Sequence, residues 1–160
     1  MNKTLETLLL LALLATGCAT TRPENLDAPH PAEQAQIQNR LQEIFDAATK
    51  KDFTRLDSYH FYGPKFTKFA TESPDRQDAA AAREAEHAGL EAVTGMKINV
   101  ENLKIDVLPD VGVATFLMRY SFQVGTNAVE RQAKGTLVLV NDRGSWKIVH
   151  EHFSALKPNP

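Results

Sequence analysis

The clearest chemical pattern in the chain is a pair of histidines, His150 and His152, separated by one carboxylate, Glu151. They lie in the segment WKIVHEHFS, residues 146–154, whose aromatic and β-branched content predicts a strand. Side chains alternate along a strand, so we expect both imidazoles on the same face as Trp146. Two imidazoles about 6.5–7 Å apart on one face can bind one zinc or copper ion, or one of them can act as a general acid or base.

A metal centre would need a third ligand, which His60 or a carboxylate could supply. No spacing in the sequence indicates such a partner, so the sequence predicts neither a metal site nor another cofactor. Acid–base catalysis stays open, because histidine titrates close to neutral pH. The candidate catalytic groups are His150 and His152, with Tyr59 as a hydrogen-bond donor, but no aspartate can be assigned as the carboxylate base.

An arginine within an apolar strand is a second candidate for recognition. Arg119 lies in TFLMRYSF, so it either pairs with a carboxylate such as Glu151 or anchors an anionic ligand. Tyr59 and His60 close a short helix, where they could line the mouth of a pocket or cap the core. A ligand pocket combines apolar walls with a few polar groups. The residues expected to line it are Tyr59, His60, Arg119, Trp146, His150 and His152.

The elements that must position these side chains divide the chain into a helical half and a strand-rich half. Apolar residues recur every three or four positions after Ala32, which predicts a helix of roughly five turns. Asp52 is a good N-cap for a second, short helix, and the alanine-rich residues 78–93 predict a third. After Met96, four β-rich runs separated by glycine-containing turns predict an antiparallel meander. Helices followed by a sheet indicate an α+β fold.

Four segments of the chain resemble the SnoaL-like members of the NTF2-like superfamily. They are KFTKF at residues 65–69, VGVATFLMRY at 111–120, KGTLVLV at 134–140 and WKIVHEHFS at 146–154. The resemblance implies a cone, in which a strongly curved antiparallel sheet wraps N-terminal helices and leaves a pocket at its open end. It also implies a homodimer formed through the outer face of the sheet. Because this superfamily shares a fold while its chemistry varies, the resemblance does not assign a reaction.

The first residues carry a targeting pattern. One cation, a short apolar run and small residues precede Cys18, the only cysteine of the chain, which predicts a secretory signal peptide over residues 1–17. The residues before Cys18 resemble a lipoprotein lipobox, which implies a lipidated cysteine that anchors the protein in a membrane. Ala19, in place of an aspartate, implies the outer membrane, with the domain facing the periplasm. We expect a tether over residues 18–31 and one domain over residues 32–157.

The charge balance limits the partners of this chain. A formal net charge of −2 leaves no basic surplus, so we expect no nucleic-acid partner. The expected function is a lipid-anchored, non-catalytic binding module for a small apolar or amphipathic ligand or for an envelope protein partner. The alternative is an enzyme of the isomerase, dehydratase or cyclase type, with His150 or His152 as the acid–base group.

Overall fold

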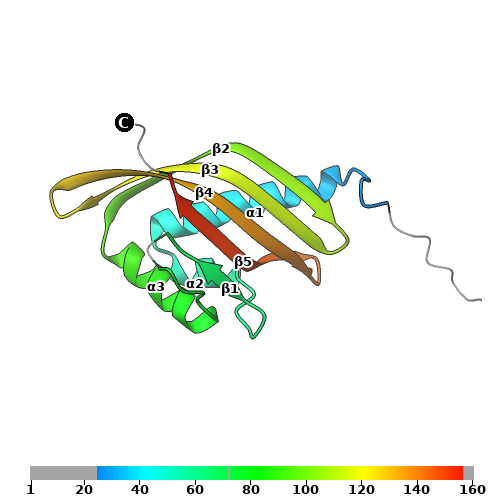
Figure 1. The fold of residues 1–160 in the computed structure, drawn as a ribbon, viewed down its shortest axis with the longest axis horizontal. Coiled ribbons are helices and arrows are strands. Elements are labelled where there is room, and N and C mark those ends of the chain that lie inside the picture. Colours follow the sequence, from blue (N-terminus) through cyan, green and yellow to red (C-terminus); the bar gives the residue numbers. More distant parts are fainter. Residues whose placement is uncertain (1–24, 72, 157–160) are drawn as a thin grey trace, which may run out of the picture.

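A computed structural model describes residues 25–71 and 73–156, which place helices against one side of a curved sheet (Figure 1). The helices are α1 (Pro31–Lys50), α2 (Phe53–Ser58) and α3 (Ala79–Glu91). The strands are β1 (Thr67–Phe69), β2 (Thr94–Leu108), β3 (Val111–Val124), β4 (Asn127–Asp142) and β5 (Ser145–Ala155). The α+β fold expected from the sequence is thus confirmed, with helices first and a meander afterwards. Cys18 and the predicted signal peptide lie outside the described residues.

Helix α1 packs an apolar stripe onto the inner face of the sheet, the face that the helices cover. The stripe follows helical spacing and is buried: Ile37, Leu41, Ile44, Ala47 and Ala48. Trp146 of β5 donates its indole N–H to Gln36 Oε1 of α1 at 3.1 Å. Gly112 of β3 leaves room for Ile37, because a Cβ at this glycine would collide with the Ile37 side chain. These contacts hold α1 in one position against β3 and β5.

The two shorter helices begin at aspartates, as the sequence predicts for the first of them. Asp52 caps α2 and Asp78 caps α3, and each side chain accepts a hydrogen bond from a backbone N–H of the first turn. Helix α3 is fastened to α2 by polar contacts. Arg83 Nη2 lies 2.7 Å and His87 Nε2 lies 2.8 Å from the carboxylate of Asp57. The position of α3 relative to α2 therefore depends on these ion pairs as well as on packing.

The sheet contains one strand that the sequence does not predict. The strand order is β1-β5-β4-β3-β2, with antiparallel pairing from β5 to β2 and parallel pairing of β1 with β5. Strand β1 has three residues, which is too short for a two-residue periodicity to be recognised in a segment that otherwise looks irregular. It supplies Lys68, which proves central to the site described below.

Strand β5 contains a bulge at Val149. Ile148 pairs with Leu139 of β4, whereas the next pair joins His150 to Val138. Val149 is therefore an extra residue in β5, and the alternation of side chains restarts after it.

The bulge changes which residues of β5 face the helices. Trp146 and Ile148 do so before the bulge, and Glu151 does so after it. The prediction that His150 and His152 share a face with Trp146 is wrong, because one inserted residue reverses the alternation. Both histidines instead lie on the outer face of the sheet, the face turned away from the helices.

The outer face of the sheet is open over most of its extent, and the β3–β4 hairpin projects beyond the helices (Figure 1). In the part of the chain that the structure describes, no helix has the length and apolar content needed to cross a bilayer.

Candidate functional site

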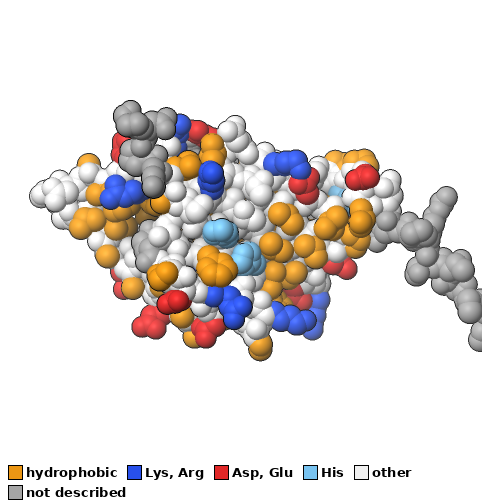
Figure 2. Space-filling model, viewed as in Figure 1, with side chains coloured by type: hydrophobic (Ala, Val, Ile, Leu, Met, Phe, Trp, Pro, Cys, Tyr) orange, Lys and Arg blue, Asp and Glu red, His pale blue; other side chains and the backbone are white. Residues whose placement is uncertain are grey.

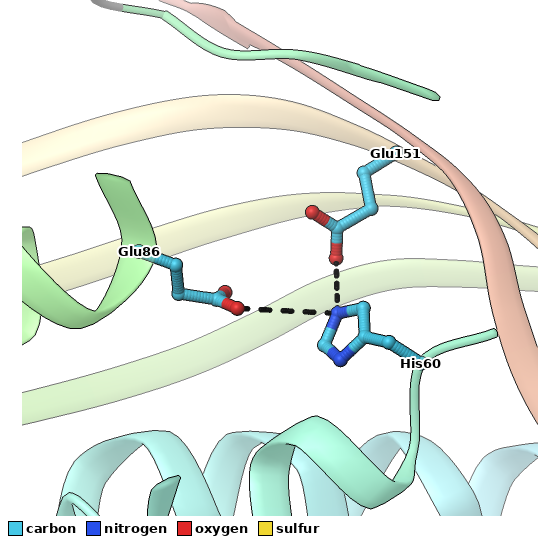
Figure 3. A group of neighbouring side chains, drawn as sticks. All are labelled: His60, Glu86 and Glu151. Atoms are coloured by element: carbon cyan, nitrogen blue, oxygen red, sulfur yellow. Dashed lines mark hydrogen bonds and ion pairs between the residues drawn. The ribbon is translucent and has the colours of Figure 1, made fainter. Parts of the chain in front are cut away.

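Four ionisable side chains meet on the inner side of the sheet, where β1, β5, α3 and the end of α2 converge. Figure 3 draws His60, Glu86 and Glu151 of this group. His60 follows α2, Lys68 is the middle residue of β1, Glu86 reaches across from α3, and Glu151 follows the bulge in β5. His60, Lys68 and Glu151 expose only 4%, 8% and 3% of their surface. We call these four residues the charged cluster.

His60 is held as an imidazolium cation by its two hydrogen bonds. Its Nδ1 lies 3.0 Å from the carbonyl oxygen of Leu56, and its Nε2 lies 3.0 Å from Glu151 Oε1. Both partners are acceptors, so both ring nitrogens must donate. Burial alone would lower the pKa of His60, but the hydrogen bond and charge of Glu151, with the charge of Glu86, outweigh burial and raise the pKa. The ring of Tyr62 stacks on the imidazole at a centroid distance of 4.7 Å.

Lys68 and Glu151 are register partners in the parallel pairing of β1 with β5. Lys68 Nζ lies 2.6 Å from Glu151 Oε2, in an ion pair whose angles fall outside those of a well-aligned hydrogen bond. Burial alone would raise the pKa of Glu151, but the charge of Lys68 and the contact with His60 outweigh it and lower the pKa to about 2. Burial likewise opposes the charge of Lys68, yet the carboxylates raise its pKa. Lys68 and Glu151 are therefore ionised at neutral pH.

Glu86 completes the charge balance from α3. Its carboxylate oxygens lie 3.5 Å from Lys68 Nζ and 4.0 Å from His60 Nε2, and the Tyr62 hydroxyl donates to it at 3.4 Å. These contacts are longer than those of Glu151, and the Glu86 side chain stays 18% exposed. Two cations and two carboxylates thus neutralise one another and connect four elements of the fold.

Three members of the charged cluster have the composition of a metal site, but the fourth argues against one. His60, Glu86 and Glu151 offer ligand atoms within 4.8 Å of one another. Lys68 Nζ already contacts both carboxylates and supplies the positive charge that a metal would bring. Both nitrogens of His60 also carry protons, whereas a metal ligand must present a lone pair. The chemistry of these residues therefore does not fit a bound metal.

His150 and His152, the β5 histidine pair, lie on the outer face, across the sheet from the charged cluster. Figure 2 views this face and shows histidine side chains at its centre, beside apolar residues. Thr67 Oγ1 and His150 Nδ1 are hydrogen-bonded at 2.7 Å, and Phe69 meets the two imidazoles edge-on at centroid distances of 6.4 and 6.0 Å. Within residues 25–71 and 73–156, neither imidazole contacts a carboxylate. The pair is thus separated from the charged groups that an acid–base site would combine with it.

Tyr59 and Trp146, two further predicted pocket residues, belong to the hydrophobic core. Tyr59 accepts a hydrogen bond from Arg55 Nε at 2.6 Å, and the guanidinium carbon of Arg40 lies 4.5 Å from the centre of its ring. Trp146 is bound to α1, as described above. Both aromatic side chains are therefore engaged in packing, and the structure does not bring them together with His150, His152 or Arg119 in one pocket.

Arg119 lies on the outer face near the β3–β4 hairpin. Its Nε lies 2.8 Å from Glu101 Oε1. The predicted alternative pairing with Glu151 is wrong, because Glu151 faces the helices from the other side of the sheet. Arg119 lines a groove with a volume of about 750 Å³, and His152 lines a smaller cavity of about 390 Å³ beside β1.

Sequence reasoning singled out His60 but missed the other three residues of the charged cluster. Lys68 carries the one usable signal, because a lysine between aromatic residues in KFTKF indicates a buried charge with a partner. Glu86 follows the pattern of a solvated helix face, and Glu151 is assigned inward only once the bulge at Val149 is known. The three residues come from β1, α3 and β5, which no local sequence pattern connects.

Comparison with known proteins identifies the family. The model of the SnoaL-like domain matches residues 37–158 of this chain. This chain belongs to the SnoaL-like domain family. The match spans the charged cluster, the β5 histidine pair and the groove, so all three lie within the SnoaL-like domain. Cys18 lies before it, and its lipidation stays a prediction.

Solved structures place this SnoaL-like domain in the NTF2-like fold. A candidate dehydratase of the NTF2-like family from Streptomyces avermitilis matches with a TM-score of 0.73 at 14% identity, over 79% of this chain and 98% of that chain. An NTF2-like protein of unknown function from Pseudomonas putida KT2440 matches with a TM-score of 0.70 at 17% identity, over 82% of this chain and 92% of that one. A candidate aromatic ring hydroxylase from Novosphingobium aromaticivorans matches with a TM-score of 0.70 at 13% identity, over 81% of this chain and 94% of that chain. No curated protein matches this chain. At these identities the likeness establishes the fold and not a reaction.

Proposed function

We propose that this SnoaL-like protein is a lipid-anchored, non-catalytic binding module of the cell envelope, which takes a small apolar or amphipathic ligand or an envelope protein partner. The observation that carries the proposal is the contrast between the two sides of its sheet. On the inner side, the charged cluster is neutralised by its own members. On the outer side, a groove of about 750 Å³ stays open, within the size range of small-molecule sites.

The arrangement of the histidines favours binding over catalysis. A general acid or base must reach the proton that it transfers, at a heavy-atom distance of about 2.6–3.2 Å. Both nitrogens of His60 are already bonded to Leu56 and Glu151, and its side chain is fully buried. His150 and His152 are accessible, but the carboxylates of the charged cluster lie on the opposite face. Among the described residues, the β5 histidine pair therefore has no partner carboxylate with which to form an isomerase-type or dehydratase-type site.

A fluorescence titration tests the binding proposal. N-phenyl-1-naphthylamine is an uncharged, apolar probe that fluoresces when it leaves water. We expect saturable binding to the full chain carrying Cys18→Ser, which excludes acyl chains from the measurement. The variant that also carries His150→Gln and His152→Gln is expected to bind equally well. If the chain without the histidine substitutions shows no saturable binding, the proposed small-ligand function is wrong.

The outer face also supports a homodimer. Six apolar side chains face outward from β2, β3 and β4, as their cross-strand pairing requires: Leu108, Val111, Val113, Leu117, Val138 and Val140. We call them the apolar patch. Leu108 is 38% exposed, and an exposed group of apolar side chains can mark an interaction site. A second copy of this chain offers the same patch and can cover it around a two-fold axis.

Sedimentation equilibrium tests the homodimer. Val138→Glu places a charge within the apolar patch and is expected to give a folded monomer, whereas the unmodified chain sediments as a dimer. Val124→Glu is the matched control, because Val124 is 49% exposed at the hairpin, outside the apolar patch. A dimer that persists in Val138→Glu, or an unmodified chain that sediments as a monomer, would contradict this interface.

Lipidation at Cys18 is proposed from the lipobox-like sequence, with the outer membrane as the anchoring surface and the domain in the periplasm. Several acyl chains would hold the protein firmly, since each buried CH₂ contributes about 0.8 kcal/mol. Metabolic labelling with a radioactive fatty acid, followed by membrane fractionation, tests this step. The label should be incorporated into the unmodified chain and absent from Cys18→Ser. Equal membrane retention of both chains would rule out the anchor.

A further inference from the structure

The groove on the outer face has a floor of paired polar residues. Its lining comes from the ends of four strands: Lys97, Ile98, Asn99, Arg119, Tyr120, Ser121, Glu130, Arg131, Gln132, Ala155 and Leu156. Two cross-strand rows form the floor. One row joins Asn99, Arg119 and Gln132, and the next joins Lys97, Ser121 and Glu130. Residues paired in this way point to the same side of a sheet, so the rows present their side chains together.

Arg119 stands in the middle strand of this floor. Its Nε lies 2.8 Å from Glu101 Oε1, and the side chain is 57% exposed. A planar guanidinium is suited to bidentate recognition of an anionic group. Arg119 therefore presents an exposed guanidinium beside the groove, although it is already paired with one carboxylate.

The charge of the groove also favours an anion. Three cations line it, Lys97 and Arg119 from the floor rows and Arg131 from the row between them, against Glu130 in the lining and Glu101, which pairs with Arg119. The methylene stems of the lysine and arginine side chains, together with half-buried Leu156, give the same groove apolar surface. The site thus combines a positive centre with apolar walls.

We propose that the groove binds a small amphipathic anion, with its carboxylate or sulfonate on the Nη nitrogens of Arg119 and its apolar body along Leu156 and the neighbouring side-chain stems. The inference rests on the binding function proposed above and names the chemical class of the ligand. The groove and the apolar patch share no residue, although they are neighbours on the outer face. Leu117 of the patch precedes Arg119 by two positions on β3, about 7 Å at roughly 3.3 Å per residue, and pairs in register with Glu101.

Two fluorescent probes of the same shape test the proposal. 8-Anilinonaphthalene-1-sulfonate is anionic, and N-phenyl-1-naphthylamine is the same aromatic body without the sulfonate. Both are titrated into the full chain carrying Cys18→Ser, and into the same chain with Arg119→Gln, with Arg119→Lys or with Arg76→Gln. Arg76 is an exposed arginine of the loop before α3 and serves as the matched control. Circular dichroism checks that each variant is folded.

We expect Arg119→Gln to weaken binding of the sulfonate by about tenfold or more, as loss of a charge-assisted hydrogen bond requires, and to leave the uncharged probe unchanged. Arg119→Lys should give an intermediate loss, because it keeps the charge and loses the bidentate geometry. Arg76→Gln should match the unsubstituted chain. Added salt should weaken the sulfonate alone.

The contradicting results separate the two proposals. If the uncharged probe binds while the sulfonate binds equally well with and without Arg119, the anion site is wrong and the binding function stands. If both probes weaken together in Arg119→Gln, this residue shapes the groove without recognising an anion, and the anion site is again wrong. If neither probe binds the unsubstituted chain, the binding function fails as well.

Discussion

Two histidine sites lie on opposite sides of the same strand and have opposite environments. His60 is buried on the inner side, with both ring nitrogens bonded to acceptors and a carboxylate at 3.0 Å. His150 and His152 lie on the outer side, where a threonine and a phenylalanine are their neighbours. His60 is bonded to a carboxylate, whereas the pair that forms the clearest pattern in the sequence contacts no carboxylate among the described residues. Chemical character here follows from which side of the sheet a residue faces.

The same comparison holds for the residues of β1. Lys68 points inward and pairs with Glu151, whereas its neighbour Thr67 points outward and pairs with His150. These two adjacent register pairs of the β1–β5 ladder therefore lie on opposite sides of the sheet. Their energies can be measured separately, and the following predictions test how the inner and outer sides differ.

The largest effect is expected from Glu151→Ala. This substitution leaves Lys68 and His60 buried with only the more distant carboxylate of Glu86, so we expect a loss of about 3–5 kcal/mol in the free energy of unfolding. Urea unfolding monitored by circular dichroism measures it. Glu130→Ala, on the outer side, is the control and should change stability by about 0.5 kcal/mol or less. Similar losses for both variants would show that the charged cluster does not stabilise the inner side.

Double-mutant cycles compare the two register pairs directly. For Lys68→Met with Glu151→Gln, we expect a coupling energy of about 2–3 kcal/mol, because two desolvated charges lose each other. For Thr67→Val with His150→Gln, we expect about 1 kcal/mol or less, the usual contribution of a single hydrogen bond. Urea unfolding of the unsubstituted chain, the four single variants and the two double variants gives both values. A larger coupling energy for Thr67 and His150 than for Lys68 and Glu151 would contradict the claim that the inner pair is the stronger one.

The dependence of stability on pH should come from His60. Because the folded state raises its pKa, the stability that it contributes is present in full below the unfolded value of about 6.5. That contribution is lost as the pH rises through the folded-state pKa, so the free energy of unfolding should fall with pH over this range. Urea unfolding at several pH values measures the slope. His60→Gln should flatten it, and an unchanged slope in that variant would assign the effect to other groups.

The smallest effects are expected on the outer side. His150→Gln and His152→Gln should each change the free energy of unfolding by about 1 kcal/mol or less, since neither side chain is paired with a charge. Thermal unfolding of the two variants checks this. A loss as large as that of Glu151→Ala would mean that the β5 histidine pair has a structural role that its contacts do not explain.

Most of the fold was predictable from periodicity, because helices and long strands leave repeating patterns. The stripe of α1, the Asp52 cap and the four-strand meander are all readable in this way. The three-residue strand β1 was not, since its pairing partner is some eighty residues away and supplies its stability. The register of β5 was not predictable either. An inserted Val149 looks like any other strand residue, and only the pairing with β4 reveals it as a bulge.

The candidate site was correspondingly harder to predict. Alternation assigned His150 and His152 to the inner face and Glu151 to the outer face, and a single bulge exchanged them. Arg119 was predicted either to pair with a carboxylate such as Glu151 or to anchor an anionic ligand, and its carboxylate partner is Glu101 on the adjacent strand β2. Sequence gives the residue types that can do chemistry. Their assembly into a cluster depends on register and on long-range pairing, which residue types alone do not specify.

Nitrogen-15 NMR of the histidine side chains tests the central claim most directly, namely that β5 turns Glu151 inward and fixes His60 as a buried cation. At neutral pH the account predicts that both ring nitrogens of His60 are protonated, with the pattern of an imidazolium, and that this pattern is lost in Glu151→Gln. A neutral His60 with one unprotonated nitrogen, unaffected by the substitution, would contradict it.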